Sequence, residues 1–313
     1  MMAVYTQLQE SDIREIAGSY DLTVVDYEPV AAGAANSNYF LWAQQGSYVL
    51  TVFEDNTFDQ VVELGELLLL LEEFEFPAPC LLPPSNGGIA SMHRGKPLML
   101  KVYIDGQVYK NLDKIMLYQV GAAMARLHQV PALNFLSDRQ PYGLQKYPSI
   151  QGQSIDVEYE DWITKRLPHL EQQKPQGLPR GLVHSDMFYD NVLFESKVLK
   201  ALIDFEEALC YDKVFDLGMG IIGLCRRGSV VVLEKARALV KGYQQVRELE
   251  EGEKKALQLF VEYAATTVSC WRYWKYHIDA PNVEKADKHR KMMHVAEGVR
   301  DISKARFLET VFS

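Results

Sequence analysis

The sequence predicts an α+β protein with two lobes: a small N-lobe built on an antiparallel sheet with one helix, and a larger, mainly helical C-lobe. Two observations lead to this prediction. Up to residue 104, short strand-like runs alternate with turn signals, whereas the segment from Val231 onward has long amphipathic helical patterns. The chain has 313 residues, which is long for one domain and sufficient for two. We therefore expect an N-lobe over residues 1–103 and a C-lobe over residues 104–313.

The elements of the N-lobe follow from local patterns. Asp12 and Glu15 fit a capping box for a short first helix that ends near Gly18. A second stretch with apolar residues at helical spacing is stopped by a group of prolines and is also expected to be helical. The expected ranges are strands over 22–30, 37–43 and 47–53, the second helix over 58–74, and a hairpin of 89–93 with 97–104.

The character of the chain changes after Asp105 and Gly106. Apolar residues recur with a helical period over 112–129, so we expect a helix there. Residues 181–205 hold short apolar runs that are broken by polar clusters, which is typical of loops and small strands. A cleft between the two lobes is the place where we expect a ligand.

Composition excludes several classes of protein. Lys and Arg number 33 against 42 Asp and Glu, and the net charge of −9 argues against a nucleic-acid binder, which needs a basic face. No apolar run approaches the roughly 20 residues of a membrane span, and the N-terminus lacks the pattern of a signal peptide. The four cysteines are far apart in the sequence. We therefore expect a soluble, cytoplasmic protein without nucleic-acid or membrane partners, while the oligomeric state stays open.

The strongest motif lies in the segment 182–194 and has the form His-x-Asp-x-x-x-x-Asn, with His184, Asp186 and Asn191. Asp204 follows thirteen residues after the asparagine, between an isoleucine and a phenylalanine. Phosphoryl transfer from Mg·ATP to a hydroxyl needs such a set: one carboxylate to accept or orient the hydroxyl proton, and an amide and a second carboxylate to hold magnesium. The alternative is a loop that matches the motif by chance.

These residues resemble the aminoglycoside phosphotransferase and choline kinase superfamily, which shares the protein-kinase-like fold. Further resemblances are the helix ending in Arg126-Leu127-His128, the segment 215–218 with Asp216, and the pair Gly242-Tyr243. The similarity extends from about residue 20 to about residue 280. It implies a kinase with ATP and Mg²⁺ as cofactors, in which Asp186 is catalytic and Asn191 and Asp204 bind the metal.

The N-terminal segments 2–6, 35–41 and 48–54 are similar to the bacterial homoserine kinase branch of this superfamily. That resemblance implies transfer to the side-chain hydroxyl of L-homoserine, with O-phospho-L-homoserine as the product on the route to threonine. An aminoglycoside, choline or another small alcohol is the alternative acceptor.

Other classes remain as weaker alternatives. The first is a nucleotide-binding module without catalysis. A protein kinase lacks support, because no Ala-Pro-Glu segment follows the metal aspartate. A metal-dependent hydrolase would need further histidine ligands at short spacing, and none is present.

The resemblance also implies roles for residues around the reacting groups. His184 and Asp216 would fix the catalytic loop without contacting the substrate. The small-residue segment between the first two strands would cover the nucleotide phosphates, because small side chains let backbone N–H groups approach oxygen anions. The strand end from Leu100 to Tyr103 would meet the adenine. The phosphate-contacting candidates in the small-residue segment are Gly33, Asn36, Ser37 and Asn38.

One position departs from the wider superfamily. A lysine or arginine normally lies on the third strand and contacts the phosphates, whereas the matching residue here is Thr51. No lysine or arginine occurs from Glu15 to His93, while twelve Asp or Glu do. The homoserine kinase branch also tends to have threonine here. The charge of ATP must then be met by magnesium, backbone amides and a cation of the C-lobe.

An amino-acid alcohol needs a cation for its carboxylate and an anion for its ammonium. Arg272, within Trp-Arg-Tyr-Trp-Lys-Tyr, is the candidate carboxylate ligand, because a guanidinium binds a carboxylate with two parallel hydrogen bonds. The surrounding aromatic residues either wall the acceptor pocket or belong to the core. The candidates for the ammonium are Asp190, Glu206 and Glu207, which lie close in sequence to the metal residues.

Overall fold

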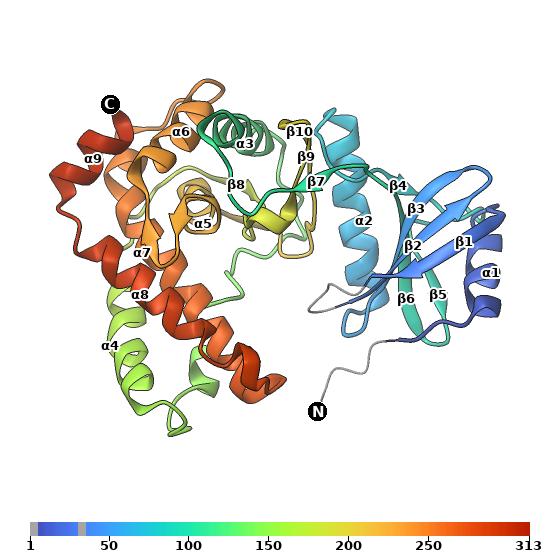
Figure 1. Ribbon diagram of the computed structural model, residues 1–313, viewed down its shortest axis with the longest axis horizontal. Helices are drawn as coiled ribbons and strands as arrows, with labels where there is room; N and C mark the ends of the chain where they lie inside the picture. The colour runs from blue at the N-terminus through green and yellow to red at the C-terminus, as the bar shows by residue number, and fades with distance from the viewer. Residues whose placement is uncertain (1–5, 31–35) are drawn as a thin grey trace. The chain divides into compact units, whose positions relative to one another are not determined.

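The structure is a computed structural model, and it describes residues 6–30 and 36–313. The chain divides into two compact units (Figure 1). The smaller unit extends to Gly106 and also takes in Lys200–Ile203, and the larger unit comprises Gln107–Leu199 and Asp204–Ser313. One unit carries an antiparallel sheet and the other is mainly helical, which confirms the predicted α+β class.

The smaller unit is built on an antiparallel sheet with strand order β1-β2-β3-β6-β4, in which β5 also pairs with β6. The three predicted strands, the second helix and the hairpin are confirmed. The predicted capping box of Asp12 with Glu15 is wrong: the helix begins earlier, and the Asp12 carboxylate accepts a hydrogen bond from the Gln9 N–H at 2.9 Å. The elements are α1 (Glu10–Gly18), β1 (Val24–Pro29), β2 (Ser37–Ala43), β3 (Gly46–Val52), α2 (Phe58–Glu73), β4 (Leu81–Leu82), β5 (Ser91–His93) and β6 (Lys96–Val102).

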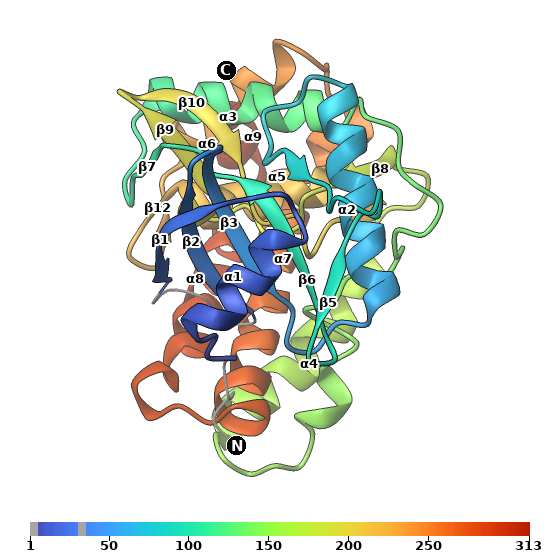
Figure 2. The same ribbon diagram turned by 90° about the vertical axis from the view of Figure 1, so that its right-hand side faces the viewer.

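The core of the smaller unit lies between α1 and one face of the sheet, and Figure 2 shows α1 lying across the strands. Side chains alternate between the two faces of a strand, so every second residue of β3 and β6 contributes. This core includes Ile13, Ile16, Leu41, Leu50, Leu98 and Leu100.

The opposite face of the sheet packs against α2. Met99 points to this face, and a Cβ added to Gly65 of α2 would lie 3.2 Å from its Cε. Thr51 is the register partner of Met99 on one side and of Asn38 on the other. Thr51 therefore belongs to the face that packs against α2 and not to the core beneath α1.

The larger unit contains the predicted helix of 112–129 as α3 and helices over most of the C-terminal part. Helix α4 has no counterpart among the predicted elements, and it contains Pro168, a residue that normally interrupts a helix. The elements are β7 (Gln107–Val108), α3 (Lys114–Leu127), η1 (Tyr147–Ser149), α4 (Val157–Gln173), β8 (Arg180–Val183), η2 (Tyr189–Asn191), β9 (Val192–Glu195), β10 (Val198–Leu202), β11 (Leu209–Asp212), α5 (Lys213–Leu224), β12 (Arg226–Arg227), β13 (Val230–Val231), α6 (Leu233–Gln244), α7 (Glu251–Tyr273), the π-helix η3 (Trp274–Asp279), η4 (Val283–Lys285), α8 (Lys288–Arg300) and α9 (Lys304–Phe312).

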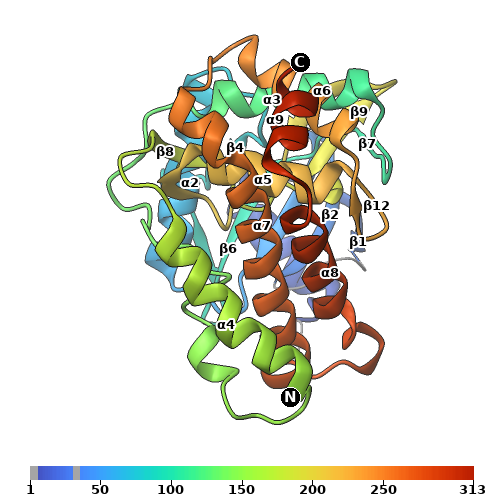
Figure 3. The same cartoon turned by 90° about the vertical axis from the view of Figure 1, so that its left-hand side faces the viewer.

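The helices of the larger unit pack around α7. Figure 3 shows α4 and α8 lying alongside α7, and α5 also packs against it. Among the helices of the described residues, none is both long and apolar enough to cross a membrane.

Helices α3 and α6 approach each other through two glycines. A Cβ on Gly121 would lie 1.9 Å from the Leu239 carbonyl oxygen, and one on Gly242 would lie 1.9 Å from the Tyr118 carbonyl oxygen. Both obstacles are helix backbone, which cannot move aside as a side chain can. The close packing of these two helices therefore requires glycine at both positions.

We expect Gly242→Ala to lower the free energy of unfolding by at least about 2 kcal/mol, because the new methyl group overpacks a contact between two backbones. Gly298→Ala is the matched control. Gly298 also lies within a helix, but nothing lies within 4 Å of an added Cβ, so this variant should be stabilised by about 0.5 kcal/mol or be unchanged. Urea unfolding followed by circular dichroism measures both. Equal unfolding midpoints for the two variants would contradict the close approach.

Candidate active site

An antiparallel ribbon of β8 and β11 positions the segment that is predicted to be catalytic. Val183, the last residue of β8, is the register partner of Leu209, the first residue of β11. The loop that leaves β8 therefore runs beside the chain that enters β11. The Ser185 hydroxyl donates a short hydrogen bond to the Glu207 carbonyl oxygen and ties the two together.

Asp216, in the first turn of α5, holds the start of this loop. Its buried carboxylate accepts hydrogen bonds from the N–H groups of His184 (3.1 Å) and Ser185 (2.8 Å) and lies 3.0 Å from His128 Nε2. Burial alone would raise the pKa of Asp216, but the bond from His128 and the other donors lower it, so the carboxylate is ionised. Ser185 has a φ of +64°, a conformation that L-residues rarely adopt. The three contacts of Asp216, with His184, Ser185 and His128, stabilise this backbone conformation.

The contact between His128 and Asp216 continues into a buried chain of hydrogen bonds. Burial lowers the pKa of His128, so its ring is neutral, with the Nε2 proton donated to Asp216 and Nδ1 accepting from the Tyr243 hydroxyl at 2.7 Å. Arg247 donates to the same hydroxyl at 2.9 Å and binds Glu253 through two bonds of 3.0 Å each. The catalytic loop is thereby linked to α3, α6 and α7.

Asp186 and Asn191 lie at the two ends of the loop and contact each other. The Asn191 amide nitrogen donates to the Asp186 carbonyl oxygen at 2.8 Å and to its Oδ2 at 2.9 Å. Both amide protons are thus directed at Asp186, so Oδ1 of Asn191 is the atom left to bind another group.

Asp204 lies near this pair, just after β10, with a φ of +68°. Burial and the charges of Asp204 and Glu207 together raise the pKa of Asp186 to about 7, while the amide of Asn191 opposes the rise. Carboxylates that raise the pKa of a neighbouring carboxyl lie close to it. An amide oxygen and clustered carboxylates are hard oxygen donors, so these residues fit a magnesium ion. Within the described part of the chain, no three His, Cys, Asp or Glu side chains are arranged to hold a metal by themselves.

The predicted nucleotide residues lie in the smaller unit. Asn36 and Ser37 are buried, the Thr51 hydroxyl donates to Asn38 Oδ1 at 2.7 Å, and Thr51 itself is fully buried. Gly33 falls outside the described residues. Contact of these residues with phosphates stays a prediction.

The two candidates for adenine contact differ in their surroundings. Leu100 is buried in the middle of β6, where it pairs with Leu50 and Leu82. Tyr103 follows the strand, is partly exposed, and donates its N–H to the Ser47 carbonyl oxygen at 2.9 Å. Adenine contact at Leu100 and Tyr103 likewise stays a prediction.

A cation that sequence reasoning missed lies next to Ser37. Lys96, at the start of β6, forms an ion pair with Glu54, and its ammonium donates to the Thr6 hydroxyl at 2.9 Å. Glu54 also accepts hydrogen bonds from the Ser37 hydroxyl and, at 2.8 Å, from the Thr6 N–H. Register pairing across the sheet brings Lys96 here from outside the stretch that lacks basic residues, so no local sequence pattern could have indicated it.

Among the predicted acceptor residues, Arg272 lies in the last turn of α7. Its guanidinium is 5.7 Å from the centre of the Phe188 ring and makes one long hydrogen bond of 3.5 Å to the Lys288 carbonyl oxygen. Burial lowers the pKa of Arg272, while the charges of Asp186 and Asp190 oppose that shift. The structure therefore brings Arg272, Asp190 and Asp186 into one electrostatic neighbourhood.

The two glutamates differ. Burial raises the pKa of Glu207, as does the charge of Asp204, while Lys146 opposes the rise, so Glu207 belongs to the carboxylate cluster. Glu206 is exposed. Binding of an acceptor by either residue stays a prediction.

Two further residues near the carboxylates come from a segment without any motif. Tyr142 is buried, and burial together with the charges of Asp186 and Glu207 raises the pKa of its hydroxyl. Lys146 lies with its ammonium 3.9 Å from the centre of the Trp274 ring. Since these residues reach the site through tertiary packing alone, sequence reasoning missed them.

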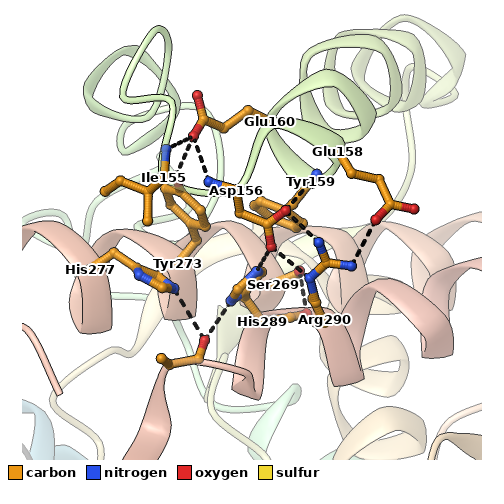
Figure 4. A network of polar contacts seen from close by, with 11 residues as sticks. Ile155, Asp156, Glu158, Tyr159, Glu160, Ser269, Tyr273, His277, His289 and Arg290 are labelled. Carbon is orange, nitrogen blue, oxygen red and sulfur yellow. Dashed lines mark hydrogen bonds and ion pairs between the residues drawn. The ribbon is translucent and has the colours of Figure 1, made fainter. Parts of the chain in front are cut away.

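A polar network anchors the residues that directly follow Arg272 and Lys288 (Figure 4). The hydroxyl of Tyr273 donates to Glu160 at 2.5 Å, so the residue after Arg272 is tied to α4. His289, the residue after Lys288, lies 3.0 Å from Asp156 through its Nε2. Tyr273 is fully buried, while Trp271, Trp274 and Tyr276 are partly exposed, so only some of the aromatic residues belong to the core.

Asp156 makes this network sensitive to acid. Burial opposes ionisation, but the hydrogen bonds from Arg290 and His289 lower its pKa to about 2, against about 3.9 in an unfolded chain. A carboxyl whose pKa is lowered by folding stabilises the folded state above the unfolded pKa, and this contribution is lost as pH falls through the folded pKa. The contribution is on the order of 2 kcal/mol.

We therefore expect wild-type protein to lose about 2 kcal/mol more stability between pH 5 and pH 2 than the Asp156→Asn variant. Urea unfolding at a series of pH values measures the difference. The exposed Asp161, changed to asparagine, is the control and should follow the wild type. Parallel stability curves for Asp156→Asn and wild type would contradict the lowered pKa.

Comparison with known proteins agrees with this geometry. The family model described as "Phosphotransferase enzyme family" matches residues 26–249. A homoserine kinase of Sinorhizobium fredii is 30% identical over 275 residues, covering 84% of each chain. A homoserine kinase of Beijerinckia indica is 28% identical over 322 residues, covering 99% of this chain and 97% of its own. An amicoumacin kinase solved with AMP-PNP and Ca²⁺ superimposes with a TM-score of 0.71 at 14% identity, covering 96% of this chain and 97% of its own.

Proposed function

This chain belongs to the phosphotransferase enzyme family, and we propose that it is a kinase that uses ATP and Mg²⁺ to phosphorylate the side-chain hydroxyl of L-homoserine. The product would be O-phospho-L-homoserine. The observation that carries the proposal is the contact of Asp186 with Asn191 beside Asp204, a set of oxygen donors that suits in-line transfer of a phosphoryl group. The names of the curated relatives support the choice of acceptor.

Each residue of the set has a separate task. Asp186 accepts the proton of the acceptor hydroxyl and orients that hydroxyl toward the phosphate. When bound, magnesium would be held by Asn191 Oδ1 and the Asp204 carboxylate and would neutralise charge on the phosphates. Asp216 and His184 keep the loop in place.

We assign nucleotide binding to residues 1–103 and catalysis and acceptor binding to residues 104–313. In the N-terminal part, the backbone around Asn36, Ser37 and Asn38 contacts phosphates together with Gly33 and Thr51. The segment from Leu100 to Tyr103 contacts adenine. Asp190, Glu206 and Glu207 are the candidates for the acceptor ammonium, and Arg272 for its carboxylate.

The charges near Phe188 favour an amino acid over the alternative acceptors. Arg272 lies within 5.7 Å of that ring, and Lys288 is close enough for Arg272 to lower its pKa. At an effective dielectric constant of about 20, a second positive charge about 6 Å from a guanidinium is opposed by about 3 kcal/mol. Choline and polycationic aminoglycosides bear only positive charge, whereas homoserine offers a carboxylate.

The test is Mg²⁺-dependent release of ADP from ATP with L-homoserine, L-serine, L-threonine, choline and an aminoglycoside as acceptors. We expect turnover with L-homoserine at least about tenfold faster than with any other acceptor, because L-serine has one methylene fewer, a difference worth about tenfold or more in a pocket, and choline and the aminoglycoside lack a carboxylate. Faster turnover with choline or the aminoglycoside would replace the acceptor but keep the kinase. Binding of Mg·ATP without turnover of any acceptor would support the non-catalytic module instead.

A further inference from the structure

Two arginines lie beside the catalytic loop without an ion pair to any carboxylate of the described residues. Arg226 follows α5 and Arg272 ends α7, and both side chains are partly buried. Neither guanidinium forms an ion pair with a carboxylate within the described part of the chain. Partly buried charges without a partner are costly, and they commonly mark a place where a ligand of opposite charge binds.

The packing of α5 places Arg226 near the part of the loop that directly follows Asp186. A Cβ on Gly223 would lie 1.9 Å from the Met187 carbonyl oxygen and 3.0 Å from Cα of Phe188, so the end of α5 touches the loop directly after Asp186. Arg226 comes only three residues later. Arg272 reaches the same place from α7, with its guanidinium 5.7 Å from the Phe188 ring.

Arg226 is held in a fixed position. Its Nε donates to the Ile222 carbonyl oxygen, and its Nη1 donates to the Gly228 carbonyl oxygen at 2.9 Å. These two bonds occupy one side of the guanidinium and leave the N–H groups of Nη2 for another acceptor. Burial and the positive charge of Arg272 together lower the pKa of Arg226 to about 10, so the two guanidinium groups are neighbours.

We propose that Arg226 is a specificity-determining residue, which together with Arg272 binds the carboxylate of the acceptor amino acid. This inference rests on the proposed phosphotransferase activity and adds a residue that no motif indicates. A planar guanidinium matches a carboxylate with two parallel hydrogen bonds, and two such groups exclude acceptors that carry only positive charge. Asp190 lies close enough for its charge to raise the pKa of Arg272, and its carboxylate suits the ammonium of a zwitterion.

We call Arg226 and Arg272 the carboxylate clamp. The network of Figure 4 supports this assignment, because it fixes the segment that carries Arg272. Tyr273 is bound to Glu160 and follows Arg272 directly. His289 is bound to Asp156 and follows Lys288, whose carbonyl oxygen accepts the only hydrogen bond that Arg272 makes within the described residues. The position of Arg272 is therefore set by the fold before any acceptor binds, which lowers the entropic cost of recognition.

The experiment compares two acceptors that differ only in the carboxylate: L-homoserine and 3-aminopropan-1-ol. For Arg226→Gln, we expect KM for L-homoserine to rise at least about tenfold, with kcat changed less than about threefold, because the clamp binds ground state and transition state alike. KM for 3-aminopropan-1-ol should stay the same or fall, because the variant removes a positive charge that repels this cationic acceptor. Arg227→Gln, at the exposed neighbouring position, is the matched control and should leave both acceptors unaffected.

The outcomes separate the clamp from the kinase activity. If Arg226→Gln raises KM for both acceptors equally, the residue only supports the hairpin of β12 and β13, and the proposal is wrong. If wild type turns over 3-aminopropan-1-ol as well as L-homoserine, the clamp is wrong while the kinase remains. Calorimetric titration with L-homoserine needs no turnover: binding that weakens at least about tenfold in Arg226→Gln supports the clamp even if the kinase assignment fails, and no binding to wild type overturns the clamp.

Discussion

Asp186→Asn is expected to lower kcat about 10³-fold, since an amide cannot accept the proton of the acceptor hydroxyl. The substitution keeps the shape of the side chain and an oxygen toward the Asn191 amide, which now donates to Asp186 at 2.9 Å. It also removes a negative charge beside Asp204 and Glu207, whose carboxylates raise the pKa of Asp186, so the folded state should be as stable as the wild type or more stable. A large loss of kcat without loss of stability is the signature of a catalytic group.

The measurement is ADP release under saturating ATP and acceptor, with thermal unfolding of the same samples. KM for ATP should change less than about threefold, because the nucleotide is bound mainly by the other candidates. Asp138→Asn, at an exposed position, is the matched control. A kcat within about tenfold of wild type would show that Asp186 does not accept the proton.

The parts of the site that follow from the sequence are those formed by residues close together along the chain. Asp186 and Asn191 are five residues apart, and the short hairpin of β9 and β10 returns the chain to Asp204. The strands and α3 were also predictable, since their apolar residues repeat with the period of the element. Local spacing therefore sufficed for the catalytic loop and for most of the fold class.

The remaining residues reach their places through packing between distant segments, which leaves no local pattern. Arg226 follows α5 and Arg272 lies in the last turn of α7, and only tertiary packing brings these two segments to the loop around Phe188. Lys96 reaches Glu54 across the sheet, far from it in the sequence. Gln9, the N-cap residue of α1, is not one of the residues that usually cap a helix. The predicted start of this helix was therefore misplaced.

Gly223 shows how such packing sets the geometry of the catalytic loop. Its missing side chain lets the backbone of α5 approach the Met187 carbonyl oxygen, at a point one residue after Asp186. Nothing at this contact is a flexible side chain. Any Cβ must displace either α5 or the loop, and α5 also carries Asp216, which fixes the start of the loop through His184 and Ser185.

We expect Gly223→Ala to lower kcat about 100-fold, because relieving an approach of 1.9 Å moves the loop by roughly the distance that disrupts alignment of reacting groups. Stability should fall by about 1–3 kcal/mol, as for other overpacked contacts. Gly220→Ala on the same helix is the matched control: its Cβ would lie 3.2 Å or more from the side chains of Leu239 and Met124, which can shift, so kcat should stay within about threefold. Steady-state kinetics with urea unfolding of both variants measures this difference. An unchanged kcat in Gly223→Ala would mean that α5 moves while the loop keeps its position, and that Asp216 does not couple the two.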